Sequence, residues 1–129
     1  MVKTYRKGYV AELELVHILA KRGWLVVRAP RSGRINLPSP DIIAVKNGKI
    51  VAIECKVRDE AFSVSKDQID QLKVWSKTGG ASVFLALKVP RRGWKFFGID
   101  MIIKMNGKIG KKSFNDGLDL EEFISLIDR

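Results

Sequence analysis

Histidine and cysteine are almost absent from this chain of 129 residues, which contains one of each, His17 and Cys55. A single cysteine excludes an internal disulfide and a zinc site built on several cysteines. A single histidine excludes a metal centre with several histidine ligands and argues against a hydrolase that depends on a catalytic histidine. Any catalytic or metal chemistry must therefore use other side chains.

Long apolar runs are also missing, since none approaches the roughly 18 residues needed to span a bilayer. The opening residues, Met-Val-Lys-Thr-Tyr-Arg-Lys-Gly, are not followed by the apolar core of a secretory signal. We therefore expect a cytoplasmic protein with no membrane partner. Because 46% of the residues are apolar and 29% are charged, the chain is expected to fold, with residues 1–129 forming a single domain.

Acidic residues are scarce: 14 Asp and Glu face 24 Lys and Arg, which gives a formal net charge of +10. The excess is uneven, with +6 over residues 1–34, +1 over 35–85, +7 over 86–112 and −4 over 113–129. So large a positive charge on a small domain predicts a polyanionic partner, with nucleic acid favoured over an anionic membrane surface.

Apolar periodicity and turn residues predict a mixed α/β fold, a central β-sheet flanked by helices. Helices are predicted over Tyr5–Arg22, Lys66–Lys77 and Asp119–Ile127, the last with a capping box formed by Asp119 and Glu122. Strands are predicted over Trp24–Ala29, Asp41–Lys46, Lys49–Val57, Ala81–Val89 and Gly93–Asp100. The segment Ile109–Asn115 is predicted to extend the sheet, and Pro30–Pro40 to form a loop.

One carboxylate of the first helix lies on the wrong face. On a helical wheel, Glu12 falls within the apolar arc between Leu19 and Val16. A buried, unpaired carboxylate is costly. Either the end of the helix overhangs the core and Glu12 pairs with a nearby lysine, or Glu12 points into a polar site at the edge of the sheet.

Asn47-Gly48 is a strong signal for a two-residue β-hairpin, and it fixes the register of the two flanking strands. In that register Asp41 faces Glu54, and Lys56 lies on the same face two residues further on. Two opposed carboxylates destabilise a hairpin unless something neutralises them. A divalent cation would do so; alternatively, Lys56 alone neutralises the pair, or a three-residue loop shifts the register and separates the carboxylates.

These residues match the needs of metal-dependent phosphodiester cleavage. Mg²⁺ is commonly held by one or two carboxylates together with waters and phosphate oxygens. The bound ion activates a water molecule, and a neighbouring lysine stabilises the negative charge that develops on the phosphate. Asp41, Glu54 and Lys56 therefore predict a nuclease site that uses Mg²⁺, with Mn²⁺ able to substitute, and no small-molecule cofactor.

Pro40-Asp41 and Glu54-Cys55-Lys56 resemble the PD-(D/E)xK nuclease signature, and the wider chain resembles the archaeal Holliday junction resolvases. The matching segments occur in order along nearly the whole chain: Arg6-Lys7-Gly8 before Glu12, Val26-Val27-Arg28-Ala29-Pro30, Ser32-Gly33, Pro40-Asp41-Ile42-Ile43-Ala44, Ile53-Glu54-Cys55-Lys56, Gly79-Gly80 and Gly117-Leu118-Asp119-Leu120-Glu121. The resemblance implies a restriction-endonuclease-like core and a homodimer that nicks a four-way DNA junction in pairs.

The resemblance also assigns residues. Glu12, Asp41 and Glu54 correspond to acidic metal ligands, Lys56 to the catalytic lysine, Ser32 to an active-site serine and Arg28 to a residue needed for DNA binding or catalysis. Two departures stand out: Leu13 replaces a basic residue common in the family, and Cys55 occupies the variable position. Asp67, Gln68 and Gln71 lie near where related nucleases use a helix glutamine, and no role is assigned to them.

Basic residues in the two positively charged segments are predicted to contact phosphates. They are Lys3, Arg6, Lys7, Arg28, Arg31, Arg34, Lys66, Arg91 and Arg92. The reading that best fits the sequence is a DNA-associated, Mg²⁺-dependent resolvase of four-way junctions. Two alternatives stay open: a repair or restriction-type nuclease of the same superfamily with another DNA-shape preference, and a non-catalytic, basic architectural DNA-binding protein.

Overall fold

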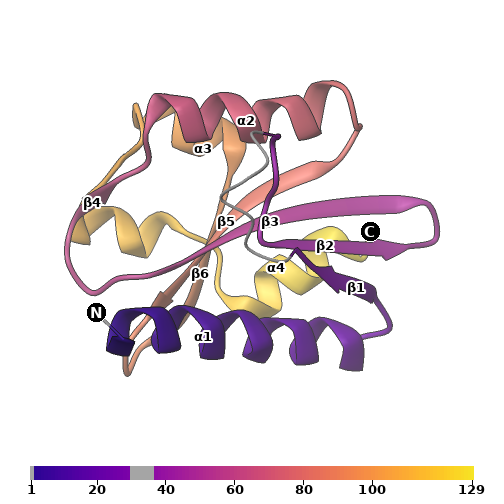
Figure 1. The fold of residues 1–129 in the computed structure, drawn as a ribbon, viewed down its shortest axis with the longest axis horizontal. Coiled ribbons are helices and arrows are strands. Elements are labelled where there is room, and N and C mark those ends of the chain that lie inside the picture. The colour runs from indigo at the N-terminus through magenta and orange to yellow at the C-terminus, as the bar shows by residue number, and fades with distance from the viewer. Residues whose placement is uncertain (1, 30–36) are drawn as a thin grey trace.

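A five-stranded mixed sheet forms the centre of the molecule (Figure 1). The computed structural model describes the backbone of residues 2–29 and 37–129, and the side chains of 7–29 and 37–129. The strands lie in the order β1 (Leu25–Arg28), β2 (Ile42–Lys46), β3 (Lys49–Val57), β5 (Ser82–Val89) and β6 (Gly93–Gly98). Only β3 and β5 pair in parallel among these neighbours; the other pairs are antiparallel.

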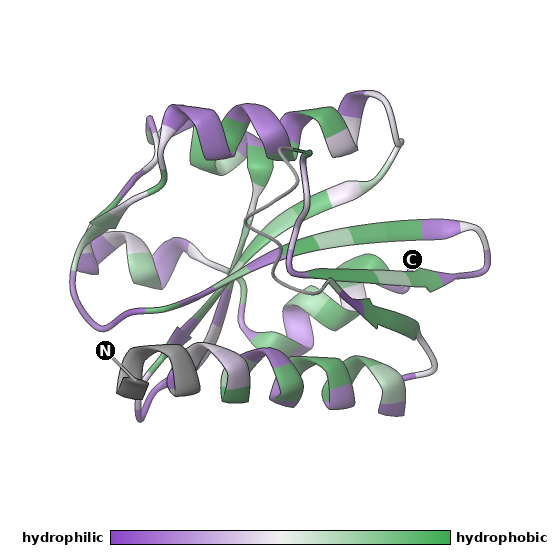
Figure 2. Cartoon of the chain, viewed as in Figure 1, coloured by the Kyte–Doolittle hydropathy of each residue, from purple (hydrophilic) through white to green (hydrophobic). Residues whose placement is uncertain are grey.

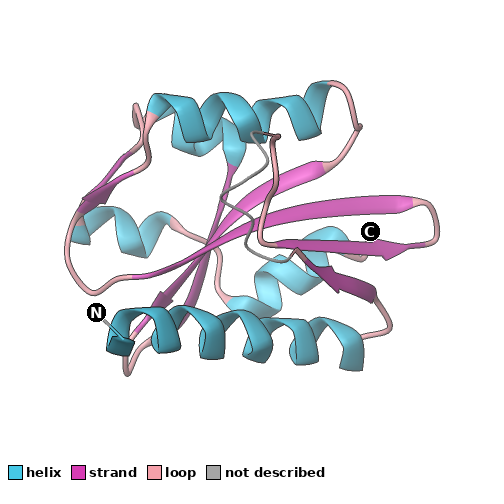
Figure 3. Ribbon diagram, viewed as in Figure 1, coloured by secondary structure: helices cyan, strands magenta, loops and turns pink. Residues whose placement is uncertain are grey.

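Helices cover both faces of this sheet (Figure 3). On one face, α1 (Val2–Lys21) and α4 (Leu120–Ile127) enclose a core in which Leu15, Phe96 and Phe123 are fully buried. On the other face lie α2 (Lys66–Lys77) and α3 (Ile99–Lys104), with separate apolar clusters around Leu72 and Ile102. This arrangement confirms the predicted fold class. Within the described ranges, no helix combines the length and apolar character that crossing a bilayer requires.

The predicted hairpin between β2 and β3 is confirmed in its register. Ile42 pairs with Ile53, and Lys46 pairs with Lys49. Asn47 and Gly48 have φ angles of 50° and 80°, which are the left-handed values that a two-residue turn of this kind requires. Ile42 and Ile53 are buried on the α1–α4 face, so the alternate positions of the two strands point towards α2.

Helix α2 is the crossover that joins the parallel strands β3 and β5, so it must lie against a face of the sheet. Its predicted bounds are confirmed, and Ser65 caps its N-terminus by accepting a hydrogen bond from the Gln68 amide at 3.1 Å. The capping box of α4 is confirmed as well. The first helix begins earlier than predicted, at Val2, and Gly23 follows it with a φ of 92°.

The prediction fails between Gly98 and Asp116. The strand predicted to reach Asp100 ends at Gly98, where the unpredicted helix α3 begins. Instead of extending the sheet, Ile109 belongs to β7 (Lys108–Ile109), which pairs with β4 (Phe62–Ser63) in a separate two-stranded sheet. Residues 111–116 form a 3₁₀-helix, η1 (Lys111–Asp116). Ile109 and Phe114 enter the same cluster, which a regular strand could not achieve because residues five apart point to opposite faces.

Candidate active site

Asp41 and Glu54 lie at the point where β2 begins and β3 continues past it. Asp41 immediately precedes β2, and the ladder that pairs Ile42 with Ile53 continues to these two residues. The Asp41 Oδ2 atom accepts a hydrogen bond from the Cys55 amide at 2.8 Å, which fixes the carboxylate against β3. The structure therefore brings together the two acidic residues that the hairpin register predicts to be opposed.

Two further side chains approach the Glu54 carboxylate. Its Oε2 atom accepts a hydrogen bond from Gln68 Nε2 at 2.9 Å and lies 3.9 Å from Lys56 Nζ. The Glu54 side chain is only 12% exposed. Gln68 lies in the first turn of α2, so the crossover helix holds Glu54 from above the sheet while Lys56 approaches it along β3.

The pKa of Glu54 is raised to about 8. Burial is the largest cause, and the negative charge of Asp41 is the second; Lys56 opposes the shift and Glu12 adds to it. A hydrogen bond with Asp41 also favours the protonated form of Glu54. With no cation present, these carboxyl groups therefore share a proton at neutral pH rather than carrying both charges.

Glu12 is buried, with 7% of its surface exposed, so the helix does not overhang the core at this position. Its Oε1 atom accepts a hydrogen bond from Arg28 Nε at 2.8 Å, and the Arg28 guanidinium stacks over the Tyr9 ring at 4.7 Å. The prediction that Glu12 pairs with a lysine is thus wrong, because an arginine of β1 reaches it first. Glu12 nevertheless raises the pKa of Glu54, which places its charge beside the same site.

Arg28→Met tests whether Arg28 mainly holds Glu12 in place. We expect the free energy of unfolding to fall by about 2 kcal/mol, because a charged hydrogen bond to a buried carboxylate is lost. Urea denaturation of Arg28→Met, Glu12→Gln and the double variant forms a double-mutant cycle. Additive effects would show that the pair is not coupled. Unchanged stability with weaker DNA binding would instead assign Arg28 to the DNA surface.

Cys55 is predicted to be an inert core side chain, and its surroundings agree. It packs against the α1–α4 core. Burial raises the pKa of the Cys55 thiol well above its usual value, and the nearby Asp41 and Glu12 charges raise it further. A thiol in such surroundings stays protonated and is a poor nucleophile.

Several of the predicted DNA-contacting residues gather at the end of the sheet opposite the Asn47-Gly48 turn. Lys7 is exposed and lines an apolar groove with Val57, Lys88 and Pro90, where β3 and β5 end. Arg91 and Arg92 are exposed on the following turn, and Lys66 is exposed at the start of α2, two residues before Gln68. Arg28 differs because its guanidinium is engaged with Glu12.

The remaining predictions cannot be placed. Ser32, Arg31 and Arg34 lie outside the described residues, as do the side chains of Lys3 and Arg6. Over the part of the chain that is described, no three acidic, histidine or cysteine side chains stand together as a preassembled metal cage. The carboxylates of Asp41 and Glu54 form the acidic pair at the centre of the site, with Glu12 beside them.

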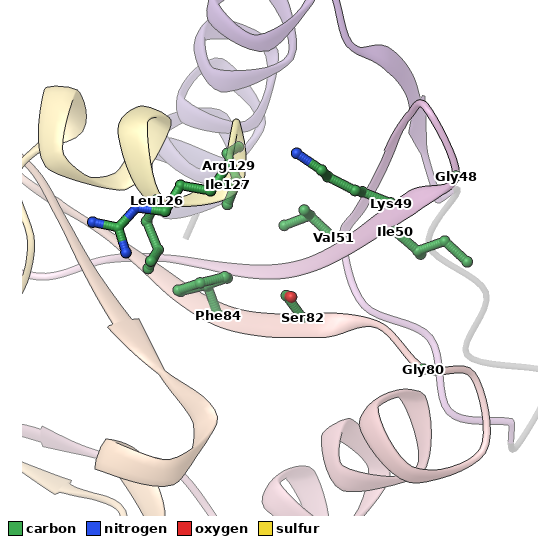
Figure 4. Close-up of a pocket in the computed structure, with 10 residues that line it drawn as sticks. All are labelled: Gly48, Lys49, Ile50, Val51, Gly80, Ser82, Phe84, Leu126, Ile127 and Arg129. Atoms are coloured by element: carbon green, nitrogen blue, oxygen red, sulfur yellow. The ribbon is translucent and has the colours of Figure 1, made fainter.

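A separate cavity of about 480 Å³ lies at the opposite end of the sheet, beside the hairpin turn (Figure 4). Val51 and Phe84 form part of its wall on the strands, and Leu126 and Ile127 border it from the end of α4. None of the predicted catalytic residues lines it. The acidic site is therefore distinct from this cavity and is built at the edge between β2, β3, α1 and α2.

Sequence reasoning missed two contacts of the site. The first is the hydrogen bond from Gln68 to Glu54, although Gln68 was one of three polar residues noted near the start of that helix. The second is the ion pair between Arg28 and Glu12. A signal for the second existed, because an acidic residue on an apolar helix face requires a partner when buried.

Comparisons with known proteins agree with this geometry. A family model described as "Archaeal holliday junction resolvase (hjc)" matches residues 3–129. The chain is 35% identical to the crossover junction endodeoxyribonuclease Hjc of Archaeoglobus fulgidus, over 90% of this chain and 88% of the relative. It is 30% identical to the protein of the same name from Sulfurisphaera tokodaii, over 95% of this chain and 88% of that one.

Solved structures give the same answer. The crystal structure of the Archaeoglobus fulgidus Holliday junction resolvase superposes with a TM-score of 0.78 at 34% identity, covering 90% of this chain and 97% of the other. A bacterial homing endonuclease shares the fold alone, with a TM-score of 0.53 at 18% identity over 82% of this chain and 73% of the other. The predicted resemblance is therefore confirmed, and the chain belongs to the archaeal Holliday junction resolvase family.

Proposed function

We propose that this chain is a single nuclease domain which, as a homodimer, resolves four-way DNA junctions by paired, Mg²⁺-dependent nicks. The observation that carries the proposal is the close pair of carboxyl groups, Asp41 and Glu54, with Lys56 beside them, in a member of this family. The relatives bear the name crossover junction endodeoxyribonuclease. An architectural DNA-binding protein would have no reason to bury carboxylates that must share a proton.

The residues present fit a divalent metal ion. Two carboxylates so close that one retains a proton to about pH 8 provide a place where a cation can replace that proton. Oxygen ligands from two carboxylates, completed by waters and phosphate, suit Mg²⁺ and also accept Mn²⁺. We assign Asp41 and Glu54 as the direct ligands. Glu12, held by Arg28, supplies a third negative charge to the site.

A metal ion bound here would lower the pKa of a water molecule and stabilise charge on the scissile phosphate. Lys56 supplies the remaining positive charge, since its ammonium group lies within reach of Glu54 and its point charge suits a phosphate oxygen. Gln68 is a positioning residue that orients the Glu54 carboxylate. Ser32 is retained as an active-site candidate on the resemblance alone.

The basic residues near the site support docking on the DNA backbone, which explains affinity without base readout. Lys7, Lys66, Arg91 and Arg92 are exposed at the end of the sheet where the site opens. Selectivity for a junction then comes from its shape, because two symmetry-related sites of a twofold dimer can engage two symmetry-related strands. This requirement for two matched sites is what makes a homodimer part of the proposal.

The salt dependence of junction binding tests these phosphate contacts. We expect Arg91→Ala/Arg92→Ala to lower the slope of log K against log salt by about 2, because two released counterions are lost. Binding is measured by fluorescence anisotropy in Ca²⁺ or EDTA, between low and moderate salt. Arg22→Ala is the matched control, since Arg22 pairs with Glu121 elsewhere on the surface. An unchanged slope in the double variant would remove this turn from the DNA surface.

The deciding experiment for the function is a nicking assay with Mg²⁺ on a labelled four-way junction and on a linear duplex of the same sequence. Paired nicks on the junction alone are the expected result. Equal cleavage of both DNAs would keep the nuclease site but favour the repair or restriction-type alternative. Tight junction binding without any cleavage would favour the architectural alternative.

A further inference from the structure

An apolar corner of the sheet, on the face that carries α2, is left uncovered. Strand β1 forms an edge of the sheet, and Val26 packs into the core on the α1–α4 face. Its neighbours Leu25 and Val27 must therefore point to the other face. They are 75% and 64% exposed, so the helices that cover the rest of that face do not reach them.

Strand pairing extends this corner across three strands. Leu25 lies opposite Val45, which lies opposite Ile50; Val27 lies opposite Ile43, which lies opposite Ala52. Ala52 is fully buried under α2, Ile43 and Ile50 pack only partly against that cluster, and the β1 residues are mostly exposed. We name Leu25, Val27, Ile43 and Val45 the open β1–β2 face; Figure 2 shows how hydrophobic both strands are.

The charge of the molecule narrows what can cover this face. None of the four side chains is charged, whereas the whole chain carries +10. Two copies repel each other through most of their surface, so they can associate only where that charge is absent. A contiguous exposed apolar patch is characteristic of an interaction site in a soluble protein. A strongly basic partner of identical sequence is thus compatible with this face and with few others.

The position of the face relative to the active site points the same way. Asp41 precedes Ile43 by two residues, and Glu54 follows Ala52 by two, so the acidic pair forms the next row on the same face. Val45 lies only about 13 Å along β2 from Asp41, at roughly 3.3 Å per residue. A second copy seated on the open β1–β2 face would therefore bring its own acidic site close to this one, with both beside the same interface.

We propose that the open β1–β2 face is the homodimer interface, where the face of one copy packs against the same face of another. This inference rests on the proposed homodimeric function and specifies the surface that creates it. Two sheet faces pack about 10 Å apart through interdigitating apolar side chains. Twofold symmetry lets one patch serve both copies, so the interface needs no second, complementary surface.

Sedimentation equilibrium without DNA or metal tests the interface directly. We expect wild type to be a dimer and both Leu25→Glu and Val27→Glu to raise the dimer dissociation constant at least about 100-fold, because each buries two unpaired carboxylates in the interface. Val10→Glu is the matched control: Val10 is 62% exposed on α1, away from this face, and its replacement should leave the dimer intact. Circular dichroism should show that every variant is folded.

A milder variant protects the test against loss of folding. Val27→Thr keeps the β-branched shape and strand preference, and it should still raise the dissociation constant about 10-fold through its buried hydroxyl. A wild-type monomer, or dimers that persist in all three face variants, would overturn the proposed interface. The nicking assay is read separately: cleavage with persistent dimers rejects only the interface, whereas dimers that dissociate as expected but whose wild type never cleaves reject only the nuclease function.

Discussion

Asp41→Asn is expected to lower the rate of junction nicking at least about 1000-fold, the scale of losing a group that stabilises the transition state. Asparagine keeps an oxygen that can accept the hydrogen bond from the Cys55 amide, so the fold of the hairpin survives. What disappears is the negative charge that, with Glu54, would hold the metal ion. The loss should therefore appear in the chemical step rather than in folding.

Junction binding by Asp41→Asn should be retained or become tighter, because a negative charge near the DNA phosphates is removed. Single-turnover nicking and anisotropy, measured on the same preparation, separate the two effects. Asp116→Asn is the matched control, an exposed aspartate in η1 with no contact to the site. Nicking by Asp41→Asn at the wild-type rate would refute the assignment of the site, whatever happens to binding.

The acidic pair was predictable because a local signal fixed it. Asn47-Gly48 sets the register of the hairpin, and the register alone places Asp41 opposite Glu54 and puts Lys56 on the same face. Two-residue turns of this kind tolerate no slip without exchanging the two faces of a strand. The capping box of α4 was predictable for a similar reason, since its two partners are only three residues apart.

Contacts between elements far apart in sequence were not predictable in the same way. Gln68 reaches Glu54 only because the crossover places the first turn of α2 above β3, and no sequence signal specifies which turn that is. Arg28 reaches Glu12 because the edge strand packs beside α1. The sequence showed that Glu12 needed a partner but favoured a lysine, since the position of an arginine on β1 depends on packing.

The segment between Gly98 and Asp116 shows a different failure. Its apolar residues are few and separated by glycines, so neither a helical nor a strand period is established over a useful length. Burial of Ile102, Ile109 and Phe114 in one cluster decides the local structure instead. Tertiary packing here overrides the weak preference of the sequence for a strand.

Glu54→Gln should make the metal-free protein more stable at alkaline pH and remove part of its pH dependence. The folded-state pKa of Glu54 is about 8, against an ordinary value of 4.5. Below pH 4.5 the group is protonated in both states and its burial carries no charge penalty. As the pH rises from about 4.5 to about 8, the unfolded chain releases this proton while the folded chain retains it, so the folded state loses stability.

The size of the effect follows from the shift, on the order of 4 kcal/mol across that pH window. Urea unfolding in EDTA at pH 5 and pH 8.5 measures it as the difference between wild type and Glu54→Gln, which should grow with pH. Glu60→Gln, at an exposed glutamate paired with Lys111, should differ from wild type by the same amount at both pH values. Mg²⁺ should restore stability to wild type at pH 8.5, since it binds the ionised pair, and should do so far less for Glu54→Gln. A difference between wild type and Glu54→Gln that stays constant with pH would mean that Glu54 ionises freely, and the reason for placing a cation beside it would be lost.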